Sequence, residues 1–266
     1  MNGKTESFER HPDLASLKMN TGLALLEMYS GRLLLWVAAK KFCRWLAGLL
    51  AFNPPTDEGP VEMVVTCNGL RVLDRKDLSG GGIDYTASFL RTLLQMDKVV
   101  PCERIFEFCA GPGYIGYSLL GAGGCQKLTL ADVNPAAVEI ARRTAALNRI
   151  EHLVNVYLSD SLKQIPLDER WDLVVGNPPH FLPTSVDDKS LIWCDPEWNV
   201  HRRFYARIKG FMKPGGHVVM LEDQAGSNFE DFRPMIEGGG GQFVAAPIGR
   251  DIDGRPMGHY YVISRW

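Results

Sequence analysis

The feature that most constrains this chain is an alternation of short apolar runs with helical patterns, which begins at Arg104 and continues to the C-terminus. Strands are expected at 104–109, 127–131, 155–158, 171–175, 217–221, 243–247 and 259–263. Helices are expected at 114–120, 135–147 and 200–212. This alternation predicts an α/β fold with a mainly parallel seven-stranded sheet, helices on both faces, and an antiparallel last strand.

The first 60 residues differ from the rest. The stretch 21–52 is rich in apolar residues and predicts a helix, and charged residues such as Lys40 and Arg44 indicate that one face of it is exposed to solvent. Prolines and a glycine over 53–60 mark a linker. We therefore expect an N-terminal helical lid or cap over 1–60 and a larger domain over 61–266. Plain packing on that domain and a membrane-surface helix are the alternatives.

Composition narrows the class of protein. Lys and Arg number 29 and Asp and Glu 31, so the net charge is −2 and the chain lacks the overall positive field that nucleic-acid binding favours. None of the six cysteines forms a C-x-x-C pair, and the histidines form no ligand pattern, so no metal site is expected. His201, Arg202 and Arg203 are expected on a solvated helix face. The polar N-terminus and the short apolar run at 33–39 predict a cytoplasmic protein without a membrane span.

A glycine-rich turn follows the first strand of the alternation. The spacing Gly111-x-Gly113-x-x-Gly116 lets backbone approach a ligand closely and presents amide groups at a helix N-terminus. Asp132 lies 21 residues after Gly111, where a ribose-binding acid is expected. Taken alone, this pattern also fits a nicotinamide dinucleotide site.

Two details favour a different ligand. Glu107 lies four residues before the first glycine, where its carboxylate would repel a pyrophosphate but attract an ammonium group. The tetrapeptide Asn177-Pro178-Pro179-His180 follows the strand at 171–175. Its two prolines lack N–H donors, so carbonyl groups are free to face the pocket, and the asparagine adds an acceptor and a donor.

With these residues, the chain from about 83 to 266 resembles a Rossmann-like class I S-adenosylmethionine-dependent methyltransferase. It is most similar to the group with an Asn-Pro-Pro-aromatic motif, which includes release-factor glutamine methyltransferases and several nucleobase N-methyltransferases. Azetidine-2-carboxylate synthases share this fold. The landmarks that match in order lie at 107–113, 130–132, 159–161 and 177–180.

The resemblance implies S-adenosyl-L-methionine as cofactor and assigns its contacts. Asp132 would hold the ribose hydroxyls with Val133 beside the adenine, and Asp160, with Ser161 beside it, would bond the adenine amino group. The remaining cofactor residues come from the first motif, the helix after it and the substrate motif: Glu107, Cys109, Ala110, Gly111, Gly113, Tyr114 and Asn177.

The resemblance also assigns the reaction side of the site. Asn177 and the carbonyl of Pro178 would accept hydrogen bonds from a substrate nitrogen and aim its lone pair at the methyl group. Tyr85, just after the glycines at 80–82, is a further pocket candidate. His180 stands where the family has Tyr or Phe, so it serves either as a stacking wall or as a titratable group.

The expected function is methyl transfer to a nitrogen of a small-molecule or amino-acid-like substrate, of the kind found in secondary metabolism. The alternative is azetidine-2-carboxylate synthesis, in which the cofactor's own α-amino group attacks its γ-carbon and expels methylthioadenosine. A non-enzymatic cofactor-binding scaffold is a third interpretation. No nucleic-acid partner is expected, and the oligomeric state is left open.

Overall fold

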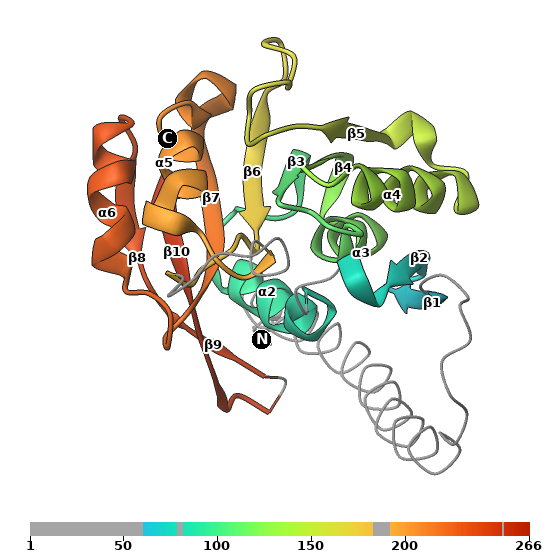
Figure 1. Cartoon of the computed structure of the whole chain (residues 1–266), viewed down its shortest axis with the longest axis horizontal. Coiled ribbons are helices and arrows are strands. Elements are labelled where there is room, and N and C mark those ends of the chain that lie inside the picture. Colours follow the sequence, from blue (N-terminus) through green and yellow to red (C-terminus); the bar gives the residue numbers. More distant parts are fainter. Residues whose placement is uncertain (1–60, 79–81, 183–191, 252) are drawn as a thin grey trace, which may run out of the picture. The chain divides into compact units, whose positions relative to one another are not determined.

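The computed structural model describes residues 61–78, 82–182, 192–251 and 253–266 (Figure 1). The lid predicted over 1–60 lies outside these residues, and so do Gly80 and Gly81 of the glycine-rich loop. The described residues all belong to one compact unit.

A small hairpin and a helix come first along the described chain. Strands β1 (Glu62–Cys67) and β2 (Leu70–Arg75) pair antiparallel, and helix α2 (Gly82–Gln95) follows. The remaining elements are β3 (Cys102–Phe108), α3 (Tyr114–Gly121), β4 (Cys125–Asp132), α4 (Pro135–Leu147), β5 (Val154–Leu158), β6 (Trp171–Gly176), α5 (Asn199–Tyr205), β7 (Met212–Asp223), α6 (Phe229–Gly238), β8 (Gln242–Ala245), β9 (Ile248–Arg250) and β10 (Pro256–Arg265).

The main sheet has the order β5-β4-β3-β6-β7-β10-β8, and β9 pairs with β10. Strands β3 to β7 run parallel, whereas β10 is antiparallel to both β7 and β8. This arrangement confirms the predicted α/β fold and its antiparallel last strand. The chain builds outward from β3 to β5 and then crosses to the other side of β3 with β6. The carboxyl ends of β3 and β6 therefore meet at a topological switch point, where open α/β sheets bind ligands.

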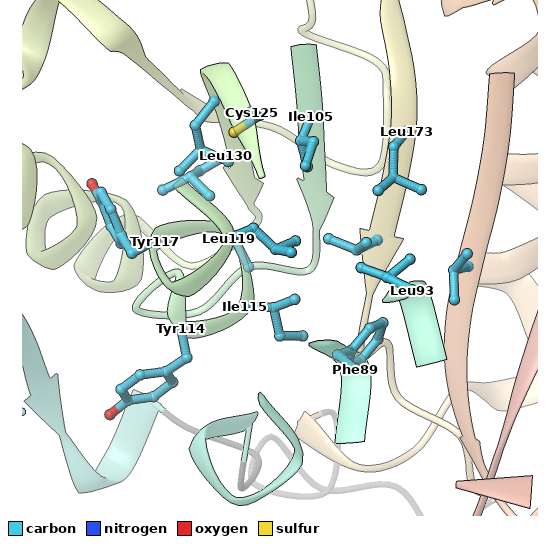
Figure 2. Packing of buried hydrophobic residues seen from close by; sticks show 14 of the residues in the cluster. Phe89, Leu93, Ile105, Tyr114, Ile115, Tyr117, Leu119, Cys125, Leu130 and Leu173 are labelled. Atoms are coloured by element: carbon cyan, nitrogen blue, oxygen red, sulfur yellow. The ribbon is translucent and has the colours of Figure 1, made fainter. Parts of the chain in front are cut away.

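Two apolar cores cover the two faces of this sheet. Successive residues of β3 point to opposite faces, so Ile105 enters the core beneath α2, α3 and α4, and Phe106 enters the core beneath α5 and α6. Figure 2 shows the first core, with Phe89 and Leu93 of α2 packed near Ile115 of α3. Both faces are thus buried, as expected for parallel strands.

The region after β6 departs from the prediction. The helix expected over 200–212 ends at Tyr205, a 3₁₀ turn spans Ile208–Phe211, and β7 begins at Met212. The Pro-Gly-Gly sequence that was expected to end a helix therefore lies inside β7. Gly215 has a φ of 80° there and donates its N–H to the Trp266 carbonyl at 2.7 Å. Only glycine adopts this left-handed conformation easily, so the glycine marks an irregular strand.

Helix α6 and strand β9 were not predicted. Pro234 inside α6 hid its helical pattern. Its start nevertheless carries a local signal, because Asn228 and Asp231 form a reciprocal capping box.

Candidate functional site

The turn from β3 to α3 is built on alternating left-handed residues. Cys109, Gly111 and Gly113 have φ values of 51°, 52° and 84°. The turn is closed by backbone hydrogen bonds, from Ala110 N to the Ala131 carbonyl at 3.0 Å and from Gly113 N to the Ala110 carbonyl at 2.8 Å. A left-handed conformation is strained for a non-glycine residue, and Cys109 carries that strain in this turn.

Glu107 lies beneath this turn and is 2% exposed. Its Oε2 accepts the N–H of Gly116 at 2.7 Å, and its Oε1 accepts the N–H of Ile115 at 3.3 Å. A Cβ on Gly116 would lie 2.7 Å from Glu107 Oε2, so this glycine allows α3 to approach β3. Burial raises the pKa of Glu107 to about 8. The contact with a cofactor ammonium stays a prediction; in the structure, both oxygens serve the start of α3.

Asp132, at the end of β4, ties two loops together. Its Oδ2 accepts the N–H of Gly111 and its Oδ1 accepts the N–H of Asn134, both at 2.8 Å. Burial raises its pKa. Asn134 caps α4, as predicted, by accepting the N–H of Ala136. Beside Asp132, the Val133 side chain is 66% exposed and offers an apolar surface at the sheet edge.

Asp160 and Ser161 follow β5 at the same edge. The Asp160 carboxylate pairs with Arg203 Nη1 of α5 at 3.0 Å. Ser161 has a φ of 55°, and its buried Oγ has no hydrogen-bond partner among the described residues. The predicted adenine contact of Asp160 would therefore share its carboxylate with Arg203.

The tetrapeptide after β6 holds unpaired polar atoms. Asn177 Oδ1 and His180 Nδ1 are buried, and neither has a hydrogen-bond partner in the part of the chain that the structure describes. Pro178 is buried, and the His180 ring lies edge-on to Phe181 at 5.0 Å between centroids. Burial lowers the pKa of His180 to about 4, so its ring is neutral at pH 7.

A distant segment holds this tetrapeptide in place. The N–H groups of His180 and Phe181 both donate to the Trp193 carbonyl at 3.0 Å, and Asp195 N donates to the Phe181 carbonyl at 2.8 Å. Gly226, after β7, packs so closely that a Cβ there would lie 2.4 Å from the His180 carbonyl oxygen. Sequence reasoning missed both supports, because they depend on tertiary pairing.

The two predicted tyrosines pack against the core. Tyr114 is 2% exposed in the first turn of α3, and Tyr85 of α2 is only partly exposed (Figure 2 shows Tyr114). The Tyr85 ring lies edge-on to His259 of β10 at 4.9 Å between centroids. Their predicted contacts with cofactor and substrate stay predictions.

His201 is not on a solvated face, so that prediction is wrong. The side chain is 1% exposed, with Nδ1 2.7 Å from Asp195 Oδ2 and Nε2 3.0 Å from Glu222 Oε1. Its neighbours Arg202 and Arg203 are exposed, as predicted. Charged side chains are therefore buried between α5 and β7.

The loops after β3, β4, β5 and β6 all lie at the carboxyl ends of the parallel strands, on one side of the sheet.

The family model of the methyltransferase small domain matches residues 75–224, which is more than half of the chain. The chain belongs to this family. The predicted methyltransferase resemblance is confirmed, and with it S-adenosyl-L-methionine as the methyl donor.

Two relatives illustrate the similarity. The release factor glutamine methyltransferase of Clostridium acetobutylicum is 24% identical over 146 residues, which cover 50% of this chain and 51% of the relative. The ribosomal RNA small subunit methyltransferase C of Hahella chejuensis is 28% identical over 132 residues, covering 50% and 34%. The matches thus span about half or less of these relatives.

A solved structure shows the shared fold. The T. thermophilus 16S rRNA N2 G1207 methyltransferase, in complex with AdoMet and guanosine, aligns with a TM-score of 0.52 at 16% identity. The alignment covers 80% of this chain and 52% of that chain. Within the described ranges, His, Cys, Asp and Glu side chains form no group that fits a metal ion. The helices described there include none long and apolar enough to cross a membrane.

Proposed function

We propose that this methyltransferase transfers the methyl group of S-adenosyl-L-methionine to a substrate nitrogen held by Asn177 and the carbonyl of Pro178. The observation that carries the proposal is Asn177 Oδ1, a buried acceptor without a partner among the described residues at the carboxyl end of β6. A buried polar atom left unsatisfied costs about 1–3 kcal/mol. A substrate N–H donor would remove that cost.

The loops beside it fit the cofactor by their chemistry. The Asp132 carboxylate accepts two backbone N–H groups, and a carboxylate has about four acceptor positions, so lone pairs remain for ribose hydroxyls. The exposed Val133 side chain next to it suits an adenine ring. Gly111 and Gly113 supply the left-handed conformations that this turn requires, beside which the methionine part would bind.

S-adenosyl-L-methionine supplies an electrophilic methyl group, so the chain's main task is orientation. The nitrogen must present its lone pair in line with that group. Two acceptors, Asn177 Oδ1 and the Pro178 carbonyl, would each take one N–H of an amide or amine and leave the lone pair in a fixed direction. The neutral, buried His180 ring would form a wall beside the nitrogen.

A small-molecule or amino-acid-like substrate is the class we propose. The chain has a net charge of −2, so it lacks the overall positive field that favours binding of a polyanion. A glutamine side chain, the acceptor named for the Clostridium relative, satisfies the two-acceptor geometry.

The test measures which nucleoside product appears. The protein is incubated with S-adenosyl-L-methionine alone, and then with glutamine, small amines, a glutamine-containing peptide or ribosomal RNA. We expect S-adenosylhomocysteine only when a nitrogen acceptor of the small or amino-acid-like class is present. Methylthioadenosine from the cofactor alone would replace this proposal with cyclisation to azetidine-2-carboxylate. Turnover with RNA alone would overturn the substrate class.

Two further proposals concern the first 60 residues and the location of the protein in the cell. We propose that residues 1–60 cover the substrate pocket and that the protein acts in the cytoplasm. Deletion of residues 1–52 should leave cofactor binding intact and abolish turnover, because water would enter the pocket. Full activity after the deletion would contradict the lid.

A further inference from the structure

Three charged side chains are buried together between α5, β7 and the segment before α5. Asp195 and Glu222 are 0% exposed and His201 is 1% exposed. The imidazole bridges the two carboxylates through Nδ1 and Nε2. The Phe232 ring lies 4.6 Å and the Trp198 ring 5.6 Å from the imidazole centroid. We call Asp195, His201 and Glu222 the buried triad.

Such a cluster needs a reason, because removing charges from water is expensive. The effective penalty is several kcal/mol per ion, and apolar residues of similar volume are often as stable or more stable. Burial opposes the charge on His201, but the carboxylates of Glu222 and Asp195 outweigh it and raise the pKa of His201 to about 9. The charged ring has two N–H groups, and each carboxylate accepts one of them.

The buried triad connects β7 to the Asn177–His180 tetrapeptide. Glu222 belongs to β7, which is fixed within the sheet. Asp195 lies on the segment whose backbone bonds to His180 and Phe181. Its carboxylate also accepts the N–H groups of Val200 and His201, at 2.8 and 3.1 Å. The connection runs from Glu222 through His201 and Asp195 to the tetrapeptide.

The segment between Trp193 and Trp198 has little regular structure of its own. Apart from a 3₁₀ turn over Pro196–Trp198, its regular pairing is one isolated bridge between Phe181 and Cys194, flanked by the three backbone hydrogen bonds to His180 and Phe181. Glu197 and Trp198 both have a φ of 57°, a left-handed conformation that non-glycine residues rarely adopt. The backbone hydrogen bonds join this segment to residues 180 and 181, and the side chains of the buried triad join the same segment to β7.

We propose that Asp195, His201 and Glu222 are positioning residues, which anchor the segment at 193–198 to β7 and so hold Asn177 and Pro178 in the arrangement that receives the substrate nitrogen. The predicted effect on turnover rests on the proposed function. The predicted effect on the backbone of the tetrapeptide rests on the structure alone.

The experiment cuts the connection on one side at a time. His201→Gln places an amide nitrogen near the position of Nε2 and retains the bond to Glu222, whereas His201→Asn retains the bond to Asp195. Glu222→Ala removes the anchor on β7 and serves if the His201 variants do not fold. Glu222→Gln keeps an acceptor for Nε2–H. The matched control is Glu169→Ala, which removes a buried carboxylate bonded to Asn155 and Tyr157 near the amino end of β6.

Two readouts separate positioning from stability. Well below each melting temperature, kcat should fall at least tenfold in His201→Gln, His201→Asn and Glu222→Ala, with the Kd for S-adenosyl-L-methionine unchanged within twofold. Hydrogen exchange of the His180 and Phe181 amides should accelerate at least tenfold in the same variants. Glu222→Gln should retain both properties, and Glu169→Ala should lower the melting temperature but leave both near wild type.

Unchanged exchange at His180 and Phe181 in the cutting variants would overturn the proposal, and so would equal acceleration in Glu169→Ala. If the wild-type protein transfers no methyl group to nitrogen, the proposed function fails, and amide exchange still decides whether the buried triad positions the tetrapeptide.

Discussion

The two halves of the sheet edge satisfy their polar groups in different ways. In the cofactor half, Glu107 and Asp132 each accept two backbone N–H groups, so the turn from β3 and the end of β4 are held by their own loops. In the substrate half, Asn177 and His180 keep buried atoms without partners among the described residues, as Ser161 does after β5. The loops after β3 and β4 are therefore preorganised by hydrogen bonds within the protein, whereas the substrate half leaves buried acceptors for its ligand.

The sharpest way to break this contrast is to remove the unpaired acceptor. Asn177→Ala should lower kcat by about 10²-fold or more, the scale that misplacing a reacting group costs. The Kd for the cofactor, measured by calorimetry, should stay within twofold, because its anchors lie after β3 and β4. Asn134→Ala is the matched control: it removes the cap of α4, costs about 1 kcal/mol of stability and leaves kcat unchanged. Equal kcat in Asn177→Ala and wild type would remove Asn177 from the site.

The cofactor half should respond through affinity. Asp132→Ala removes the acceptor of Gly111 N–H together with the proposed ribose contact. The binding free energy of S-adenosyl-L-methionine, measured by calorimetry, should become less favourable by about 1–3 kcal/mol. Asp172→Ala is the control, since Asp172 also accepts a backbone N–H, from Arg104, but near the amino end of β6. Equal weakening in both variants would show a general loss of stability.

The packing of α3 on β3 gives a smaller, purely structural effect. A Cβ on Gly116 would meet Glu107 Oε2 and Leu128 Cδ1 at 2.7 Å. Gly116→Ala should therefore lower the free energy of unfolding by about 1–3 kcal/mol, measured with denaturant. Gly238→Ala, in α6 with open space around it, should instead raise that free energy by about 0.5–1 kcal/mol. A stable Gly116→Ala variant would contradict the close approach.

The parts predicted from sequence are those with local signals. The Asn134 cap and Pro135 fixed the start of α4, and alternating apolar runs placed β3, β4 and β6. Strand order then brought the loops at Glu107, Asp132 and Asn177 to one edge. Their spacing along the chain was enough, because parallel strands end on the same side of a sheet.

The parts that were missed depend on which side chains and backbone groups meet when the chain packs. His201 precedes two arginines in the sequence, and this predicts a solvent-exposed side chain. In the structure it is buried, with hydrogen bonds to Asp195, 6 residues away, and Glu222, 21 residues away. Glu107 was expected to face a ligand, yet both oxygens accept N–H groups of α3. The type of residue was informative at both positions, but its partner was set by packing.

The smallest effect on activity is expected at His180, where the two interpretations separate. The ring is 5% exposed, neutral at pH 7 and edge-on to Phe181, so we expect His180→Phe to keep kcat within threefold. The pKa of His180 lies near 4 in the folded state, below its usual 6.5, so the unfolded chain binds more protons between these two values. The free energy of unfolding therefore decreases as the pH is lowered from 6.5 to 4. When the pH is lowered from 7 to 4.5, the free energy of unfolding of His180→Phe should therefore decrease by about 2 kcal/mol less than that of the wild type. His152→Phe, which replaces an exposed histidine on a 3₁₀ turn, is the control variant. A large fall in kcat, with a moved acidic limb of the pH–rate profile, would instead make the imidazole nitrogen part of the chemistry.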